Sequence, residues 1–243
     1  MNDFPADIDR KFRLPRIWSN RELARFAPLF RGEIANVSGW RDEDKEGRYY
    51  RSYFSAADSY TITNYKAEAR GFQGEPGEIF LDLTKPLPPN LAGRFDVVLN
   101  HTVLEHIYEV QTAFNNLCQM SRDVVIVVVP MLQQMHAEYG DYWRFTPQTM
   151  RRMYADNGLT LRYVSFNSHP LSSVYLFCIG MKHPERWQNH IPEQLTHEDP
   201  YPTGDHFADY VGCHALANTQ FKPGTHAGRP SLLRRIANAL NGR

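Results

Sequence analysis

Polar side chains that could bind a ligand or transfer a proton follow a short apolar run in the middle of the chain. The run, at residues 97–99, is typical of a buried parallel strand that is covered on both faces. The polar residues that follow it are Asn100, His101, Glu105 and His106. Because ligands of open α/β sheets bind beyond the carboxyl ends of the strands, we expect these residues to lie at a binding site.

A second group of polar and aromatic residues lies within residues 136–144, after an apolar run at 123–129 that stops at Pro130. The loop should emerge at the same edge of the sheet, and loops on a rigid scaffold are where catalytic and recognition groups concentrate. We therefore predict that it closes one side of the site. Its candidate residues are His136, Asp141, Tyr142, Trp143 and Arg144.

Three of these residues are candidate general bases: His136, Asp141 and His106. His136 is preferred because its loop lies over the expected pocket. His106 and Glu105 could instead cap backbone groups at the start of a helix. Asp141 could form a structural ion pair with Arg144 that pins the loop.

The candidate substrate-binding residues are Tyr142, Trp143 and Arg144. The two aromatic rings offer flat faces that suit a sugar ring or adenine, although aromatic residues also serve as plain packing.

The elements that must position these residues alternate between strands and helices. Strands are predicted at residues 33–37, 60–63, 78–82, 95–99, 123–129, 159–166 and 174–181. One helix face lies at 110–118, and a second helix begins at Thr146-Pro147 and ends at Asn157-Gly158. A short loop joins the last two strands. The pattern predicts an α/β, doubly wound sheet of seven mostly parallel strands with an antiparallel last strand.

Three parts of the chain are expected: an N-terminal arm and helix at 1–30, the α/β domain at 31–182, and an irregular extension at 183–243. A capping box at Ser19 and Glu22 is predicted to open the first helix after an irregular arm at 1–18. The extension holds six of the ten histidines, but they are too widely scattered to indicate a metal site, and we predict none. A short amphipathic helix at 231–240 could dock on the domain or mediate oligomer formation.

Charge and composition argue against several classes of function. The 243 residues carry 27 basic and 27 acidic side chains, so nothing draws the chain generally toward nucleic acid or a membrane surface. Three distant cysteines indicate reduced thiols of a cytoplasmic protein. We see no signal peptide in the charged first sixteen residues, and no apolar stretch approaches the roughly 20 residues of a membrane span.

Three motifs resemble those of class I S-adenosylmethionine (SAM)-dependent methyltransferases of the type 11-like group, over about residues 30–182. Residues 95–106 (FDVVLNHTVLEH) are similar to the "FDvv…vLEH" segment at the fourth strand of that family. Residues 79–83 and 86–88 resemble the acidic turn after the third strand and the "LP" that follows. His136 with residues 140–146 resembles the "H…DYWRFT" signature of a subgroup associated with glycans and other surface polymers.

The glycine-rich loop departs from the family pattern. Asn36 stands where an acidic residue is usual, Gly39 is the single glycine, and Trp40 adds bulk where the backbone should approach SAM. Asn64 is nearest to the position of the acidic residue that normally holds the ribose hydroxyls. An amide can still bond a hydroxyl, but without the assistance of a charge.

The resemblance implies a Rossmann-like fold, SAM as cofactor, and methyl transfer to a small-molecule or glycan-linked acceptor, at a hydroxyl. The implied cofactor-binding residues are Asn36, Ser38, Gly39, Asn64, Asp82, Leu83, Asn100 and His101. Asp82 and Leu83 would face the adenine, and the loop at 36–39 would flank the methionine part. The alternative is a noncatalytic methyltransferase-like domain with a weakened SAM site, kept for binding or as a scaffold.

Overall fold

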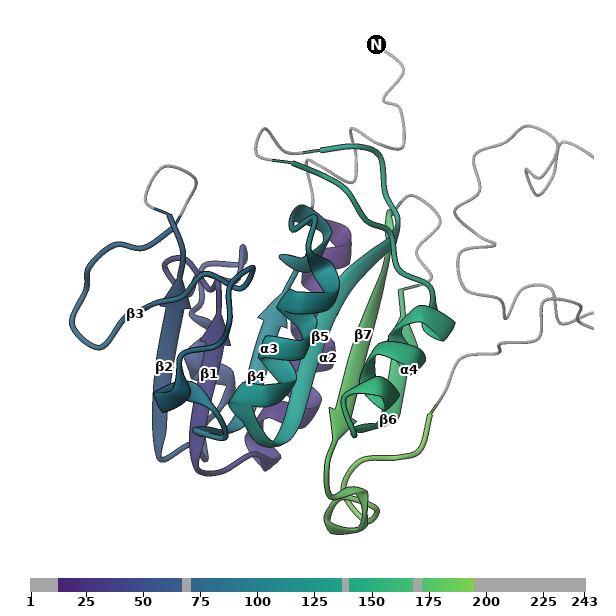
Figure 1. Ribbon diagram of the computed structural model, residues 1–243. Helices are drawn as coiled ribbons and strands as arrows, with labels where there is room; N and C mark the ends of the chain where they lie inside the picture. Colours follow the sequence, from purple (N-terminus) through teal and green to yellow (C-terminus); the bar gives the residue numbers. More distant parts are fainter. Residues whose placement is uncertain (1–12, 67–70, 137–139, 168–171, 195–243) are drawn as a thin grey trace, which may run out of the picture.

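A single mixed sheet of seven strands organises the chain in the computed structural model, which describes residues 13–66, 71–136, 140–167 and 172–194 (Figure 1). Its order is β3-β2-β1-β4-β5-β7-β6. The strands are β1 (Glu33–Val37), β2 (Ser59–Asn64), β3 (Ile79–Phe80), β4 (Phe95–His101), β5 (Ser121–Leu132), β6 (Thr160–Phe166) and β7 (Val174–Met181). β7 pairs antiparallel with both β5 and β6, and the other pairs are parallel. This confirms the predicted α/β sheet with an antiparallel last strand.

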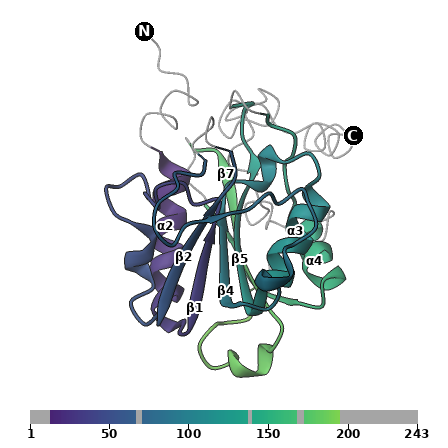
Figure 2. The same ribbon diagram turned by 60° about the vertical axis from the view of Figure 1, so that its left-hand side comes forward.

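Helices cover both faces of the sheet (Figure 2). Helix α2 (Leu14–Phe26) lies on one face, and α3 (Val110–Met120) and α4 (Pro147–Asp156) lie on the other. Alternate residues of β5 enter the two cores: Val124 and Ile126 pack on the α2 side, and Val125 and Val127 on the side of α3 and α4. A continuous apolar run is therefore required in β5, because both of its faces are buried.

Short 3₁₀ turns complete the described elements at Ala27–Leu29, Tyr50–Tyr53, Pro89–Leu91, Leu104–His106 and Pro184–Arg186. The predicted signals of helix α4 are confirmed. Thr146 Oγ1 accepts a hydrogen bond from Thr149 N at 3.1 Å, and Gly158 adopts a φ of +71° just after the helix.

The predicted capping box at Ser19 is wrong, because α2 already begins at Leu14. Pro15 lies in the first turn, where its fixed φ favours a helix start. Ser19 Oγ instead donates to Arg16 O at 3.0 Å, and Glu22 accepts from Tyr163 Oη at 2.6 Å. Ser19 thus bonds the backbone of the preceding helical turn, and Glu22 makes a tertiary contact with β6.

Several strand limits also differ from the prediction. β4 continues past the predicted end at Leu99 to His101, and β5 begins at Ser121. β5 continues past Pro130 to Leu132, with a register irregularity between these residues. β3 is shorter than the predicted strand at 78–82. The charged segment at 41–48 forms turns and an isolated bridge, so no helix joins β1 to β2 apart from the turn Tyr50–Tyr53 among the described residues.

The first part of the predicted C-terminal extension packs on the α2 side of the sheet. Ile191 is fully buried, and the ring of Trp187 meets that of Phe30 at a centroid distance of 5.1 Å. The predicted irregular arm at 1–18 is wrong at its end, because residues 14–18 belong to α2, and its residues 1–12 lie outside the described residues. The segment 195–243, with the predicted helix at 231–240, also lies outside them. Within the part of the chain that the structure describes, no helix has the length and apolar character needed to cross a membrane.

Candidate functional site

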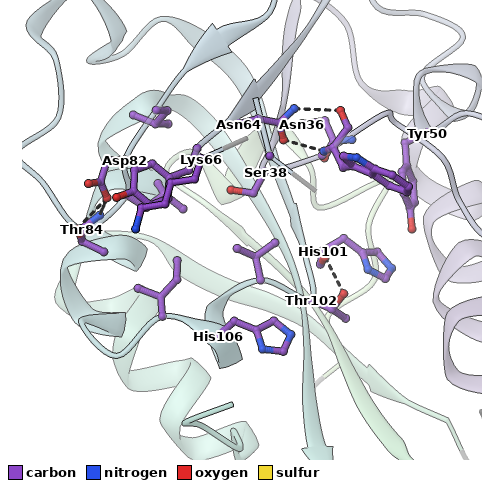
Figure 3. A pocket seen from close by; sticks show the side chains of 18 of the residues that line it. Asn36, Ser38, Tyr50, Asn64, Lys66, Asp82, Thr84, His101, Thr102 and His106 are labelled. Atoms are coloured by element: carbon purple, nitrogen blue, oxygen red, sulfur yellow. Dashed lines mark hydrogen bonds between the residues drawn. The ribbon is translucent and has the colours of Figure 1, made fainter. Parts of the chain in front are cut away.

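A cavity of about 550 Å³ opens at the carboxyl ends of β1, β2, β3 and β4 (Figure 3). The chain leaves β1 toward β2 on one side and leaves β4 toward β5 on the other, so the cavity lies at a topological switch point of the sheet. Its volume falls within the range of small-molecule sites. The predicted site residues that line it are Asn36, Ser38, Gly39, Asn64, Asp82, Leu83, His101, His106 and Tyr142.

The loop after β1 adopts glycine-like backbone conformations with residues other than glycine. Ser38, Trp40 and Asp42 have φ values of 59°, 51° and 66°. The backbone N–H groups of Ser38 and Gly39 both donate to Thr63 O, at 2.7 and 3.3 Å. At Gly39 an added Cβ would lie 2.5 Å from the Asn36 amide nitrogen, so glycine is required for close packing there.

A buried carboxylate that the sequence did not reveal holds this loop. Asp42 is fully buried and accepts hydrogen bonds from Asn36 Nδ2 and Tyr60 Oη, both at 2.8 Å, and from Arg51 N at 3.0 Å. Burial, together with the Asp42 charge, holds the pKa of Tyr60 well above its usual value, so that the phenol remains a donor. The Asn36 side chain is therefore an anchor of the turn.

Asn64, at the end of β2, fixes the backbone of Trp40. Its Oδ1 accepts from Trp40 N at 2.7 Å, and its Nδ2 donates to Trp40 O at 3.0 Å and to Glu78 Oε1 at 2.5 Å. Both amide hydrogens are thus engaged within the protein. The predicted contact of Asn64 with a ribose stays a prediction.

Asp82 follows β3 and forms part of the cavity wall (Figure 3). Its Oδ1 accepts from Thr84 N at 2.9 Å and from Thr84 Oγ1 at 2.7 Å. These two bonds fix the carboxylate at the cavity wall. Leu83, beside it, is buried and supplies an apolar surface.

His101, the last residue of β4, is held in one tautomer by helix α2. Arg16 can only donate, so its contact with His101 Nδ1 at 2.6 Å makes Nδ1 the acceptor. Nε2 therefore carries the proton and donates to Ser19 Oγ at 2.8 Å. Burial, followed by the charge of Arg16, lowers the pKa of His101 well below its usual value. Arg16 also lines the cavity, and its place in the sequence gave no signal of this.

Asn100, the remaining predicted cofactor residue, is absent from the cavity wall. It is fully buried, and its Nδ2 donates to Val37 O at 3.0 Å, across from β4 to β1.

The loop around Arg144 is fixed by an ion pair. Arg144 contacts the two oxygens of Asp141 at 2.5 and 2.8 Å, and Asp141 Oδ2 accepts from His136 N at 2.8 Å. The hydrogen-bonded Arg144 guanidinium lowers the pKa of Asp141 to about 2. Trp143 Nε1 donates to Ile107 O at 3.0 Å. None of the residues Asp141, Trp143, Arg144 and His136 lines the cavity itself, whereas Tyr142 does.

Glu105, His106 and His136 converge beside the cavity, with one potential ligand atom of each within 4.8 Å of the others. Glu105 is fully buried, and neither carboxylate oxygen has a hydrogen-bond partner among the described residues. Burial raises the pKa of Glu105 to about 7. His106 Nδ1 contacts Gly140 O at 2.6 Å, and the two imidazole rings lie 5.0 Å apart.

The sheet order and the antiparallel β7 define the class: this is a Rossmann-like α/β protein with a mostly parallel seven-stranded sheet. No protein-family model and no curated protein matches the chain.

Solved structures with a similar fold include SAM-dependent methyltransferases with different substrates. The magnesium protoporphyrin IX methyltransferase of Synechocystis, with bound SAH, is 11% identical with a TM-score of 0.47, over 73% of this chain and 85% of that chain. The 1,6-didemethyltoxoflavin-N1-methyltransferase of Burkholderia thailandensis, with bound S-adenosylhomocysteine, is 13% identical with a TM-score of 0.47, over 73% and 86%. Human N-acetylserotonin methyltransferase, in complex with SAM, is 13% identical with a TM-score of 0.47, over 70% and 53%.

Proposed function

We propose that this protein transfers a methyl group from SAM to a hydroxyl of a small-molecule or glycan-linked acceptor. The observation that carries the proposal is the cavity at the switch point of the sheet, lined by all of the predicted cofactor residues except Asn100. The motif resemblance at residues 95–106 and 136–146 supports the same assignment.

The cavity fits SAM in volume and in the chemistry of its walls. The loop at 38–39, in which Ser38 already adopts a glycine-like backbone conformation, would hold the methionine part. Asp82 and Leu83 would hold the adenosine part, with Asp82 accepting hydrogen bonds from its hydroxyl or amino groups. Because the Asn64 amide is engaged with Trp40 and Glu78, we assign the charge-assisted contact to Asp82.

When bound, SAM supplies a methyl group that its sulfonium already activates, so the protein must chiefly align the acceptor. His106 lines the cavity and is the base that we propose for the acceptor hydroxyl. Its Nδ1 contact with Gly140 O leaves Nε2 as the proton-accepting atom. Burial lowers the pKa of His106, which keeps the imidazole neutral at pH 7. Asp141, with a pKa of about 2, is a much weaker base.

Calorimetry with SAM and with S-adenosylhomocysteine tests the proposal. The wild-type protein should bind both, and Asp82→Ala should weaken binding by about tenfold or more, since a lost charge-assisted hydrogen bond is worth at least about 1.4 kcal/mol. The matched control is Asp156→Ala, because Asp156 is an exposed residue of α4 that pairs with Arg152. It should bind as the wild type does.

Two results would contradict the proposal. Equal affinity in Asp82→Ala and Asp156→Ala would remove Asp82 from the site. If the wild-type protein binds neither SAM nor its demethylated product, the alternative of a noncatalytic binding or scaffold domain takes the place of the enzyme.

A further inference from the structure

We propose that Glu105, His106 and His136 bind a divalent transition metal of the zinc type at the edge of the cavity. The three side chains come from two segments, the turn Leu104–His106 after β4 and the loop after β5. One potential ligand atom from each lies within 4.8 Å of the other two. The fold therefore brings together residues that are thirty positions apart in the sequence.

The first argument is the carboxylate. Glu105 is 0% exposed, and neither of its oxygens has a hydrogen-bond partner among the described residues. A buried polar group without a partner costs stability, and such a group calls for a ligand that satisfies it. The basic side chain nearest to it among the described residues is His106, whose Nε2 lies 3.7 Å from Glu105 Oε1, beyond hydrogen-bond distance. A cation between these atoms would satisfy the carboxylate.

The second argument is the set of groups that lie next to the second ring nitrogen of each histidine. A metal-binding histidine usually donates its second ring N–H to a backbone carbonyl or a carboxylate. His106 Nδ1 lies 2.6 Å from Gly140 O, which leaves Nε2 of His106 as its coordinating atom. His136 Nδ1 is buried without a hydrogen-bond partner among the described residues, and Asp141 Oδ2 lies 3.3 Å from it. Asp141 is itself fixed by Arg144, so the whole arrangement is braced.

The donor set indicates the class of metal. Two imidazoles and one carboxylate suit zinc and related transition metals, whereas calcium and magnesium prefer oxygen ligands. In a tetrahedral zinc site the ligand atoms lie roughly 3.4 Å apart, so small side-chain rotations would close the present arrangement. Three protein ligands leave a fourth position open, as in catalytic zinc sites.

The open position has a use that rests on the proposed methyl transfer. His106 lines the cavity, so an acceptor hydroxyl could occupy the fourth position. Metal coordination lowers the pKa of a bound hydroxyl, and its proton would then pass to water. The alkoxide oxygen would form a bond to the methyl carbon while the S–CH₃ bond breaks. The electron pair of the broken S–CH₃ bond would stay on sulfur. In that case the metal would replace His106 as the activating group.

Metal binding can be tested without any assay of activity. The full chain, without an affinity tag and freed of metal with a chelator, is titrated with Zn²⁺ in a calorimeter and with Co²⁺ in a spectrophotometer. We expect one Zn²⁺ per chain and visible Co²⁺ bands of a low-coordinate site. Glu105→Gln and His136→Ala should each weaken Zn²⁺ binding at least tenfold. His190→Ala, which removes an exposed histidine outside the cluster, should not change it.

Equal Zn²⁺ affinity in the wild type and in both cluster variants would overturn the proposal, because histidines elsewhere in the chain would then hold the metal. An absence of saturable binding to the wild type would do the same. SAM titration of the same samples separates this proposal from the proposed function. A chain that binds Zn²⁺ but not SAM keeps the metal site and loses the methyltransferase, and the opposite result does the reverse.

Discussion

His101 shows, at the scale of a single residue, how this protein fixes a buried polar group in one protonation state. The imidazole accepts from Arg16 and donates to Ser19, and Tyr50 packs on its ring at a centroid distance of 5.3 Å. A protonated imidazole could not accept from the guanidinium. The neutral form is thus built into the wall of the cavity, where it presents no titrating charge to a ligand near neutral pH.

This arrangement predicts a loss of stability in mild acid. The folded pKa of His101 lies well below the unfolded value of about 6.5, so the unfolded chain takes up the proton first. The contribution of His101 is complete above about pH 6.5 and is lost as the pH falls toward the folded pKa. Urea denaturation between pH 7.5 and 5 should show a slope of up to about 1.4 kcal/mol per pH unit that His101→Asn reduces.

His190→Ala is the control for this measurement, because it removes an exposed histidine that lies outside the group around His101. The groups that face His101 are Arg16, Ser19 and Tyr50, and the first of these keeps its charge throughout the range. Identical slopes for the wild type and His101→Asn would show that His101 is not the group responsible.

At the scale of elements, the loop after β1 holds its residues at positive φ with hydrogen bonds. Such loops usually reach positive φ with glycine. Non-glycine residues rarely adopt positive φ, and each instance costs on the order of 1–3 kcal/mol. Here Asn64 holds both backbone groups of Trp40, and Asp42 holds Asn36. The surrounding structure imposes the conformation, so the loop is shaped before any ligand binds.

Substitutions at Ser38, where φ is 59°, test this view. Ser38→Gly relieves the strained backbone, although it gains freedom in the unfolded state, so it should stabilise the fold by up to about 1 kcal/mol. Ser38→Val places a β-branched residue at positive φ and should destabilise by about 1–2 kcal/mol. The control, Ser52→Gly at an exposed position of the turn Tyr50–Tyr53, should lower stability by about 0.5–1 kcal/mol. Chemical denaturation measures all three, and a destabilising Ser38→Gly would contradict the prediction.

The same loop shows why the sequence predicted some elements and missed others. Strands β4 and β5 and helix α4 carry local signals, namely continuous apolar runs and the Thr146 cap. The geometry of the β1 loop depends on contacts of Asn64 with Trp40, which lies 24 residues away. The start of α2 was missed because Ser19, which reads as a cap, is used for a bond to His101 across 82 positions.

In the candidate site, too, some residues could be predicted from the sequence and others could not. Most of the predicted residues at the ends of strands line the cavity, with Asn100 as the exception, since sheet topology alone brings these strand ends to one edge. Arg16 and Asp42 were missed, because an isolated charged residue in a helix or a loop carries no local sign of burial. The convergence of Glu105 with His136 also depends on the loop after β5, whose path no local pattern specifies.

At the scale of the whole molecule, the site depends on both cores of the sheet. Helix α2, on one face, supplies Arg16 to the cavity, while the turn after β4 supplies His106. Strand β7 lies between β5 and β6 and is buried along its whole length, so it joins the two cores. A change in the packing of β7 should therefore lower the stability of the whole domain.

Gly180 of β7 is closely packed against helix α4. An added Cβ would lie 2.1 Å from Cδ1 of Tyr154, a fully buried ring of α4 whose hydroxyl donates to Val125 O at 3.1 Å. Gly180→Ala should lower the free energy of unfolding by about 1–3 kcal/mol, because neither the sheet nor the anchored ring can move away freely. Thermal and urea denaturation would measure the loss.

A double-mutant cycle locates the cause of that loss. In a Tyr154→Leu background the smaller side chain leaves room for the new methyl group, so the cost of Gly180→Ala should fall by at least about 1 kcal/mol. Tyr163→Phe is the matched background, because Tyr163 packs against the α2 face of the sheet, and there the cost should stay as in the wild type. If both backgrounds leave the cost unchanged, the strain lies in the backbone of β7. A fall of the same size in both would mean that the two cores respond as one unit, and helix α2 with Arg16 would then be coupled to α4 through the sheet.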